Sequence, residues 1–171
     1  MLRARICTVL QIACVAHAIL RVMPDDVGHE IADALGALLR RGARARLYAR
    51  LTGNLGEAVD ETTYPVLSGL ARTGPCSAAD LAGEIGLDRS GVTRRATRLE
   101  EAGLLCREPD PDDRRAILLA LTETGQQAVQ ITRQRLVTII EASLASWPPE
   151  EAQSFAHQLH RFVTTGPFAK S

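Results

Sequence analysis

Stretches at both ends of the chain place apolar residues three or four positions apart, which is the spacing of amphipathic helices. Residues 25–52 predict one helix, which ends where Gly53 breaks the pattern. Residues 123–146 predict a long helix, and a last helix begins at Pro149. The apolar positions of the first two helices are Ile31, Leu35, Leu38, Leu39, Val129, Leu136, Ile139, Ile140 and Leu144. We expect the buried side of the last helix to be Phe155, Leu159, Phe162 and Val163.

Shorter helices, separated by turn residues, fill the middle of the chain. One is predicted over residues 61–72, a second runs from an N-cap at Ser77 to Gly86, and a third runs from an N-cap at Asp88 to Ala102. Gly86 stands where a left-handed residue commonly ends a helix. Two helices joined by a turn that contains glycine form a helix-turn-helix.

The residues that follow the helix-turn-helix are not helical in pattern. Residues 104–107 and 116–121 are short apolar runs, and residues 108–115 between them are charged and contain two prolines. This order predicts a strand, a turn and a strand, which together form a wing. The predicted fold class is mainly α with a small β wing: a winged helix-turn-helix with helices before and after it.

The same pattern divides the chain into parts. We expect residues 25–165 to form one domain, in which residues 61–121 are the DNA-binding lobe. Residues 25–52 and 122–165 are the predicted dimerisation helices, because their apolar faces are large for a small domain. Thr122 is the predicted N-cap of the long helix, and residues 166–171 form a tail.

Residues 1–24 are an extension with three interpretations. A basic start, a mostly apolar run and the sequence AHA at 16–18 mimic a secretory signal peptide. In the second interpretation, which we favour, Met23 is the true start and the preceding residues are translated upstream sequence. In the third, the segment is an extra helix that packs on a dimer. The apolar run is too short and too interrupted to span a bilayer.

The helix predicted over residues 89–102 has two different faces. Val92, Ala96 and Leu99 fall on one face, which we assign to the core, and arginines and hydroxyls occupy the other. No acidic residue occurs from 89 to 99, as entry of this helix into the major groove requires. The alternative is an incidentally basic solvent face. The predicted DNA contacts are Ser77, Arg89, Ser90, Thr93, Arg94, Arg95, Thr97, Arg98, Arg114 and Arg115.

The predicted wing turn carries both signs of charge. Arg114 and Arg115 suit contact with the minor groove or with phosphates. Asp113 is expected to orient a neighbouring arginine through a charge-assisted hydrogen bond. The nearby acids, including Asp110 and Asp112, should limit non-specific affinity for DNA.

Composition narrows the function classes. The net charge is zero, with 20 basic and 20 acidic residues, which argues against a non-specific polycation but allows a basic face. The cysteines show no metal-ligand spacing. His157 and His160 lie three apart on the last helix, a spacing that could serve a metal, but no Asp, Glu or Cys beside them completes a ligand set. We find no nucleophile motif or phosphate-binding glycine loop. We therefore expect no enzyme activity, no metal and no cofactor. An alternative to DNA binding is a winged helix used only for protein contacts. An alternative to structural, reduced cysteines is a redox-sensing thiol.

Two groups of residues resemble the MarR family of bacterial regulators. Residues 87–94 (LDRSGVTR) and 99–105 (LEEAGLL) are similar to that family's recognition helix and the start of its first strand. Residues 113–115 (DRR) and 119–125 (LALTETG) are similar to its wing signature, D-x-R and then L-x-L-T-x-x-G. The likeness covers about residues 25–165.

This resemblance implies a specific mode of action. It implies a cytoplasmic homodimer, whose recognition helices (89–102) read a palindromic double-stranded operator in the major groove while its wings (108–115) contact the minor groove or the backbone. It also implies repression that is relieved by a small aromatic or amphipathic effector, bound in a crevice between the dimerisation helices and the DNA-binding lobe. No membrane partner is implied.

Overall fold

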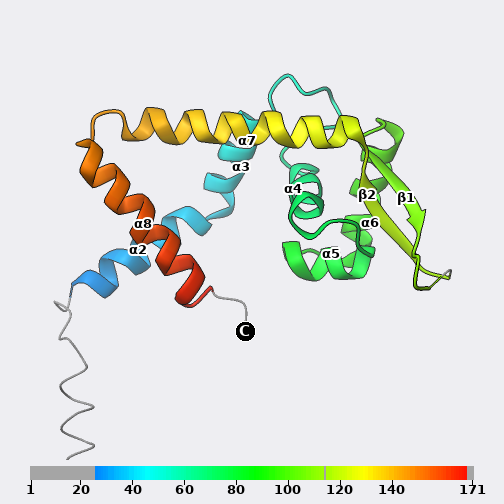
Figure 1. Ribbon diagram of the computed structural model, residues 1–171, viewed down its shortest axis with the longest axis horizontal. Coiled ribbons are helices and arrows are strands. Elements are labelled where there is room, and N and C mark those ends of the chain that lie inside the picture. Colours follow the sequence, from blue (N-terminus) through cyan, green and yellow to red (C-terminus); the bar gives the residue numbers. More distant parts are fainter. Residues whose placement is uncertain (1–25, 114, 169–171) are drawn as a thin grey trace, which may run out of the picture. The chain divides into compact units, whose positions relative to one another are not determined.

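The structure, a computed structural model, describes residues 26–113 and 115–168, so the whole 1–24 extension, Arg114 and residues 169–171 of the predicted tail lie outside the described residues. The chain divides into two compact units, with the boundary after Leu47. The described elements appear along the chain in Figure 1. They are α2 (Val27–Leu39), α3 (Arg41–Thr52), α4 (Tyr64–Thr73), α5 (Ala78–Ile85), α6 (Arg89–Glu101), β1 (Leu105–Pro109), β2 (Ile117–Leu121), α7 (Glu123–Leu144) and α8 (Pro149–Thr165).

The single helix predicted over residues 25–52 is wrong, because the structure has two helices there. Arg40 breaks the run with an extended backbone (φ −58°, ψ 132°), and its carbonyl accepts the first hydrogen bonds of α3, from Ala43 and Arg44. Gly36 and Gly42 flank this break, and each lowers helix propensity relative to alanine. The cluster of arginines adds repulsion between like charges along the same stretch.

The winged helix-turn-helix itself is confirmed. The Ser77, Asp88 and Thr122 side chains each accept a backbone N–H at the start of α5, α6 and α7, and Gly86 ends α5 in the left-handed region (φ 66°). The core below these helices is apolar and continuous. It includes Val66, Leu67, Leu70, Leu81, Val92, Ala96, Leu99, Leu105 and Leu119.

Helix α4 begins at Tyr64, three residues later than predicted. The delay has a local cause, because residues 60–63 form a turn held by side chains. The Asp60 carboxylate accepts the backbone N–H groups of Thr62 (2.7 Å) and Thr63 (2.9 Å). The buried Thr63 hydroxyl in turn donates to the carbonyl of Ala58 (2.7 Å). These bonds compete with helical ones, which is why aspartate and threonine favour turns.

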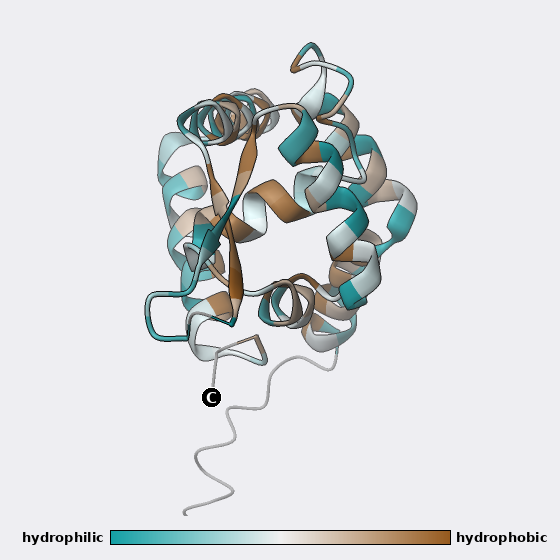
Figure 2. Ribbon diagram, turned by 90° about the vertical axis from the view of Figure 1, so that its right-hand side faces the viewer, coloured by the Kyte–Doolittle hydropathy of each residue, from teal (hydrophilic) through white to brown (hydrophobic). Residues whose placement is uncertain are grey.

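The wing is a two-stranded antiparallel hairpin that pairs Leu105 with Leu121 and Pro109 with Ile117. Much of β2 is coloured as hydrophobic in Figure 2, and Leu119 at its centre is buried. Behind the hairpin, α7 starts so close to the chain that a methyl group on Gly125 would collide with the Leu104 carbonyl oxygen. The glycine therefore sets how tightly the wing packs on α7.

The apolar side of α8 is uncovered in the single chain. Phe155, Leu159 and Val163 are each more than 40 % exposed, and no residue of α8 is buried. The prediction that this side of the last helix is buried is therefore wrong for the single chain. None of the helices in the described ranges combines the length and hydropathy that crossing a bilayer demands.

Candidate nucleic-acid interface

Helix α6 is fixed at its start and along its inner face. The Asp88 carboxylate accepts the Gly91 N–H (2.7 Å) and the Ser90 hydroxyl (2.5 Å), and these bonds, the Ser90 one first, lower the pKa of Asp88. Val92, Ala96 and Leu99 are fully buried beneath the helix. The opposite face is thereby forced outward.

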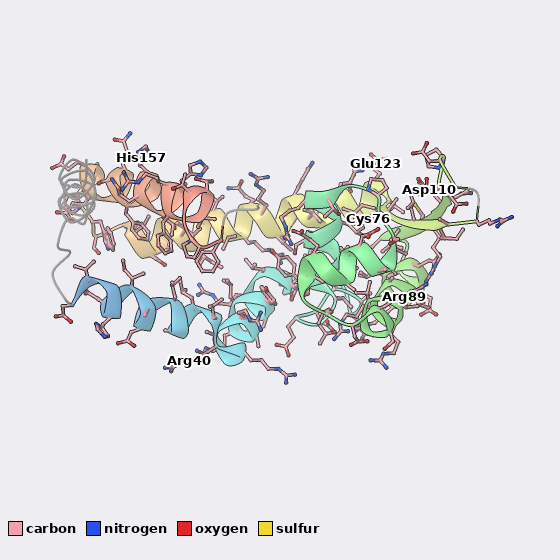
Figure 3. All side chains as sticks on the ribbon, turned by 90° about the horizontal axis from the view of Figure 1, so that it is seen from below. Arg40, Cys76, Arg89, Asp110, Glu123 and His157 are labelled. Atoms are coloured by element: carbon pink, nitrogen blue, oxygen red, sulfur yellow. The ribbon has the colours of Figure 1, made fainter. Side chains whose placement is uncertain are left out.

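A groove of about 400 Å³ lies between the start of α5, the outer side of α6 and the wing. Four residues predicted to contact DNA line it together: Ser77, Arg89, Thr93 and Arg115. Figure 3 shows Arg89 on α6, and Asp110 marks the wing turn in the same view. The guanidinium groups in this concave surface match the donors that contact phosphates and base edges, and the Ser77 and Thr93 hydroxyls, which donate to Asp80 Oδ2 and to the Arg89 carbonyl, add acceptors.

Two further residues of this groove were missed by the sequence reasoning. Arg107 on β1 lines the groove and reaches α6, where Nε binds Glu100 Oε2 (2.8 Å) and Nη2 donates to Thr97 Oγ1 (3.1 Å). Ile117 on β2 also lines it and is 49 % exposed. Nothing in the local sequence marks an arginine or an isoleucine in a strand as part of this groove. Their place in it depends on how the hairpin packs against α6.

The wing turn is held by backbone contacts of its aspartates. Asp110 Oδ1 accepts the N–H of Asp112 (2.9 Å), and Asp113 Oδ1 accepts the N–H of Arg115 (2.9 Å). Within the described part of the wing, Asp113 therefore binds the main chain of Arg115, and no ion pair joins it to that guanidinium. The other neighbouring arginine, Arg114, lies outside the described residues, so the orienting role of Asp113 stays a prediction.

Two arginines predicted to contact DNA also reach a neighbouring loop of the same chain. Arg98 donates from Nη1 to Asp60 Oδ2 (2.6 Å) and from Nη2 to the Glu57 carbonyl. Arg95 donates from Nε to the Thr62 carbonyl (2.8 Å) and from Nη1 to Gly91 (2.9 Å). Their guanidinium groups are thus engaged within the chain, which the helical pattern alone could not show.

The remaining predicted contacts sit on the outer face of α6. Ser90, Thr93, Arg94 and Thr97 are all exposed. The Thr93 and Thr97 hydroxyls donate to carbonyls one turn earlier, at 2.9 and 3.1 Å, so each retains an accepting lone pair. In the described part of the chain, Arg94 makes no hydrogen bond or ion pair.

Known proteins are similar to this chain in sequence and in fold. The family model described as the MarR family matches residues 59–117, which contain α4, α5, α6, β1 and the wing turn up to the first residue of β2. The HTH-type transcriptional regulator YxaD of Bacillus subtilis is 31 % identical over 127 residues, covering 74 % of this chain and 86 % of YxaD. The chain belongs to the MarR family. This MarR protein is also 36 % identical over 117 residues to a putative transcriptional regulatory protein for the hcr operon of Thauera aromatica, covering 67 % and 70 % of the two chains.

Solved structures agree with this assignment. RV1404 from Mycobacterium tuberculosis superposes on the MarR chain with a TM-score of 0.64 at 26 % identity, covering 85 % of this chain and 95 % of that one. The transcriptional regulator Tm0710 from Thermotoga maritima gives a TM-score of 0.59, also at 26 % identity, over 84 % and 97 % of the two chains. The protein is thus a DNA-binding transcriptional regulator by family.

The described cysteines of this MarR chain are free thiols, Cys76 and Cys106. Burial, reinforced by the neighbouring Glu108 carboxylate, raises the pKa of Cys106. A raised pKa lowers the fraction of thiolate, which is the reactive form. Cys106 therefore lacks the electrostatic setting of a redox-sensing thiol. Cys7 and Cys14 lie outside the described residues.

Proposed function

We propose that α6 reads a specific operator from the major groove while the wing contacts the flanking backbone or minor groove. The observation that carries this proposal is the groove in which Ser77, Arg89, Thr93 and Arg115 converge. Arg94 extends the same surface along α6. Arginine suits the task because its planar fork donates two hydrogen bonds to guanine or to a phosphate.

Charge along α6 supports insertion of its N-terminal half. The first turn contains no acidic residue that would repel the DNA backbone, and the Asp88 carboxylate at the N-cap is engaged by the Ser90 hydroxyl and the Gly91 N–H. Glu100 and Glu101 stand at the opposite end, where helix-turn-helix docking leaves the groove. Glu100 is also paired with Arg107, which reduces its repulsion of the DNA backbone.

We infer that the functional form is a homodimer on a palindromic operator. The uncovered apolar side of α8 supports this, because Phe155, Leu159 and Val163 would stay in water in a monomer. Ile131 and Ile140 on α7 are similarly exposed. A two-fold dimer would cover such surfaces and would place two copies of α6 on successive turns of the duplex.

The regulatory outcome in this proposal is repression in the cytoplasm, relieved by a small amphipathic effector. A groove of about 530 Å³ between the end of α3 and α7 supports the effector, since it combines apolar walls with two guanidinium groups. It is lined by Arg50, Ile131, Gln134, Arg135, Thr138 and Ile139. A ligand there shifts DNA binding only if it prefers one of two conformations of the dimer.

The proposal is tested with the intergenic DNA upstream of the protein's own gene. Footprinting with the full-length protein should protect a palindromic site, and binding should weaken steeply as salt rises because arginines displace counterions. Sedimentation of the free protein should give the mass of a dimer. Failure to protect or shift any promoter fragment would favour the alternative of a winged helix used only for protein contacts.

A further inference from the structure

The contacts of α6 divide its four arginines into two pairs with different roles. Arg89 and Arg94 face outward, one in the groove beside the wing and the other on the exposed face. Arg95 and Arg98 instead reach the loop of residues 57–63, which joins α3 to α4. We propose that Arg98, with Asp60, positions the recognition helix and does not itself read DNA.

The loop offers Arg98 a site built for a guanidinium group. Nη1 donates to the Asp60 carboxylate at 2.6 Å and Nη2 donates to the Glu57 carbonyl, so both terminal nitrogens of the guanidinium group are bound. Arg95 adds a bond to the Thr62 carbonyl at 2.8 Å, so the contact spans the length of the loop. The loop is itself anchored, because Val59 between these contacts is buried in the core.

The two carboxylate oxygens of Asp60 accept hydrogen bonds from different partners. Oδ1 accepts the N–H groups of Thr62 and Thr63 and the Thr62 hydroxyl, which shapes the turn before α4. Oδ2 accepts Arg98. Although partial burial raises the pKa of Asp60, these hydrogen bonds, including the one from Arg98, hold it well below the usual range. The carboxylate is therefore charged and paired at neutral pH.

The consequence for DNA binding is geometric. The 57–63 loop follows α3, and its contacts with Arg95 and Arg98 fix the flank of α6 that faces away from the wing. Arg107 fixes the opposite flank through Glu100 and Thr97. With both flanks held, the outward side chains of α6 keep one orientation when DNA arrives, which lowers the ordering cost of binding.

Removing the Asp60 charge distinguishes positioning of α6 from direct DNA contact by Arg98, because the two roles predict changes of opposite sign in operator affinity. Asp60→Asn keeps an oxygen for the turn but places an amide N–H₂ against Arg98. It therefore breaks only the contact between Asp60 and Arg98, which we call the clamp. If Asp60 and Arg98 position α6, this variant should bind the operator about threefold to tenfold more weakly. If Arg98 instead contacts DNA, freeing it and removing a negative charge should strengthen binding. Asp112→Asn, which removes an exposed wing acid that has no ion-pair partner among the described residues, is the matched control.

A double-mutant cycle with Arg98→Ala completes the test on the footprinted operator duplex. For a clamp, the double variant should bind no more weakly than the worse single variant, and the slope of log K against log salt should stay at the wild-type value. An independent readout is amide hydrogen exchange of residues 57–63, which should become faster in Arg98→Ala without DNA.

The outcomes separate this proposal from the proposed function, on which it rests. Additive losses, with a slope smaller by about 1 per subunit and so by about 2 for the dimer in Arg98→Ala, would show that Arg98 contacts a phosphate and would overturn the clamp. Equal or tighter operator binding by Asp60→Asn would overturn it as well. A wild-type protein that binds no operator would instead refute the DNA-reading assignment, while the hydrogen-exchange result would still decide whether Arg98 holds the loop.

Discussion

Replacing Arg94 with alanine perturbs the proposed reading face and, apart from the smallest of the interactions that lower the pKa of Asp88, little else. In the described residues its guanidinium makes no hydrogen bond or ion pair, and it stands exposed on the outer face of α6. Exposed substitutions of this kind change stability by about 0.5 kcal/mol or less. Alanine also has the highest helix propensity. A loss of DNA binding in this variant therefore reports on a contact with DNA and not on unfolding.

The magnitude follows from the chemistry of one contact and the symmetry of the assembly. An arginine that binds a base bidentately contributes about 1–3 kcal/mol, or roughly fivefold to 160-fold in affinity. A dimer would insert two copies of α6 into half-sites far enough apart to act independently. The loss for Arg94→Ala should then be about 2–6 kcal/mol per dimer, which is at least about thirtyfold.

Fluorescence anisotropy with operator and scrambled duplexes at fixed salt measures this effect. The specific affinity should fall while the affinity for the scrambled duplex changes little, because base contacts carry sequence information and phosphate contacts do not. Arg133→Ala removes an exposed arginine from α7 and serves as the control for charge alone. Equal losses on both duplexes would assign Arg94 to a phosphate. Unchanged operator binding would refute the reading face as drawn.

Three further predictions concern packing, assembly and pH. Gly125→Ala should destabilise the protein by about 1–3 kcal/mol through collision with the Leu104 carbonyl, seen as a lower Tm, whereas Gly83→Ala, which meets nothing within 4 Å, should not. Leu159→Glu should shift the sedimentation mass toward the monomer, and Gln153→Glu, on the opposite side of α8, should leave it unchanged; equal masses for both would refute the interface. The lowered pKa of Asp88 implies stability that is present above about pH 4 and is lost as pH falls, so Asp88→Asn should flatten the dependence of Tm on pH between 7 and 3.

The features that followed from sequence are those fixed by short-range chemistry. The caps at Ser77, Asp88 and Thr122 could be predicted because a side-chain oxygen needs only a backbone N–H a few residues away. The wing could be predicted because two apolar runs flank a charged turn with two prolines. Both rules work without knowledge of the rest of the fold.

The features that escaped prediction depend on contacts between distant segments. Arg98 and Asp60 are 38 positions apart, and no periodicity in either segment marks them as partners. The apolar side of α8, including Leu159, was predicted to be buried but is exposed in the single chain. Apolar periodicity identifies which side of a helix avoids water, but it does not show whether the residues that pack on that side come from the same chain. The break at Arg40 escaped because neither proline nor glycine occupies that position.

The pairing of some arginines and not others explains how a chain with no net charge can hold a selective DNA-binding surface. Asp60 neutralises Arg98 and Glu100 neutralises Arg107, so the charges at the two flanks of α6 are compensated within the protein. Positive potential is then left to outward side chains such as Arg89, Arg94 and Arg115, none of which has an ion-pair partner in the described residues. Fewer uncompensated cations release fewer counterions, which keeps non-specific affinity low without weakening contacts to base edges. Acidic residues beside the interface therefore favour specificity, because discrimination depends on the ratio of specific to non-specific binding.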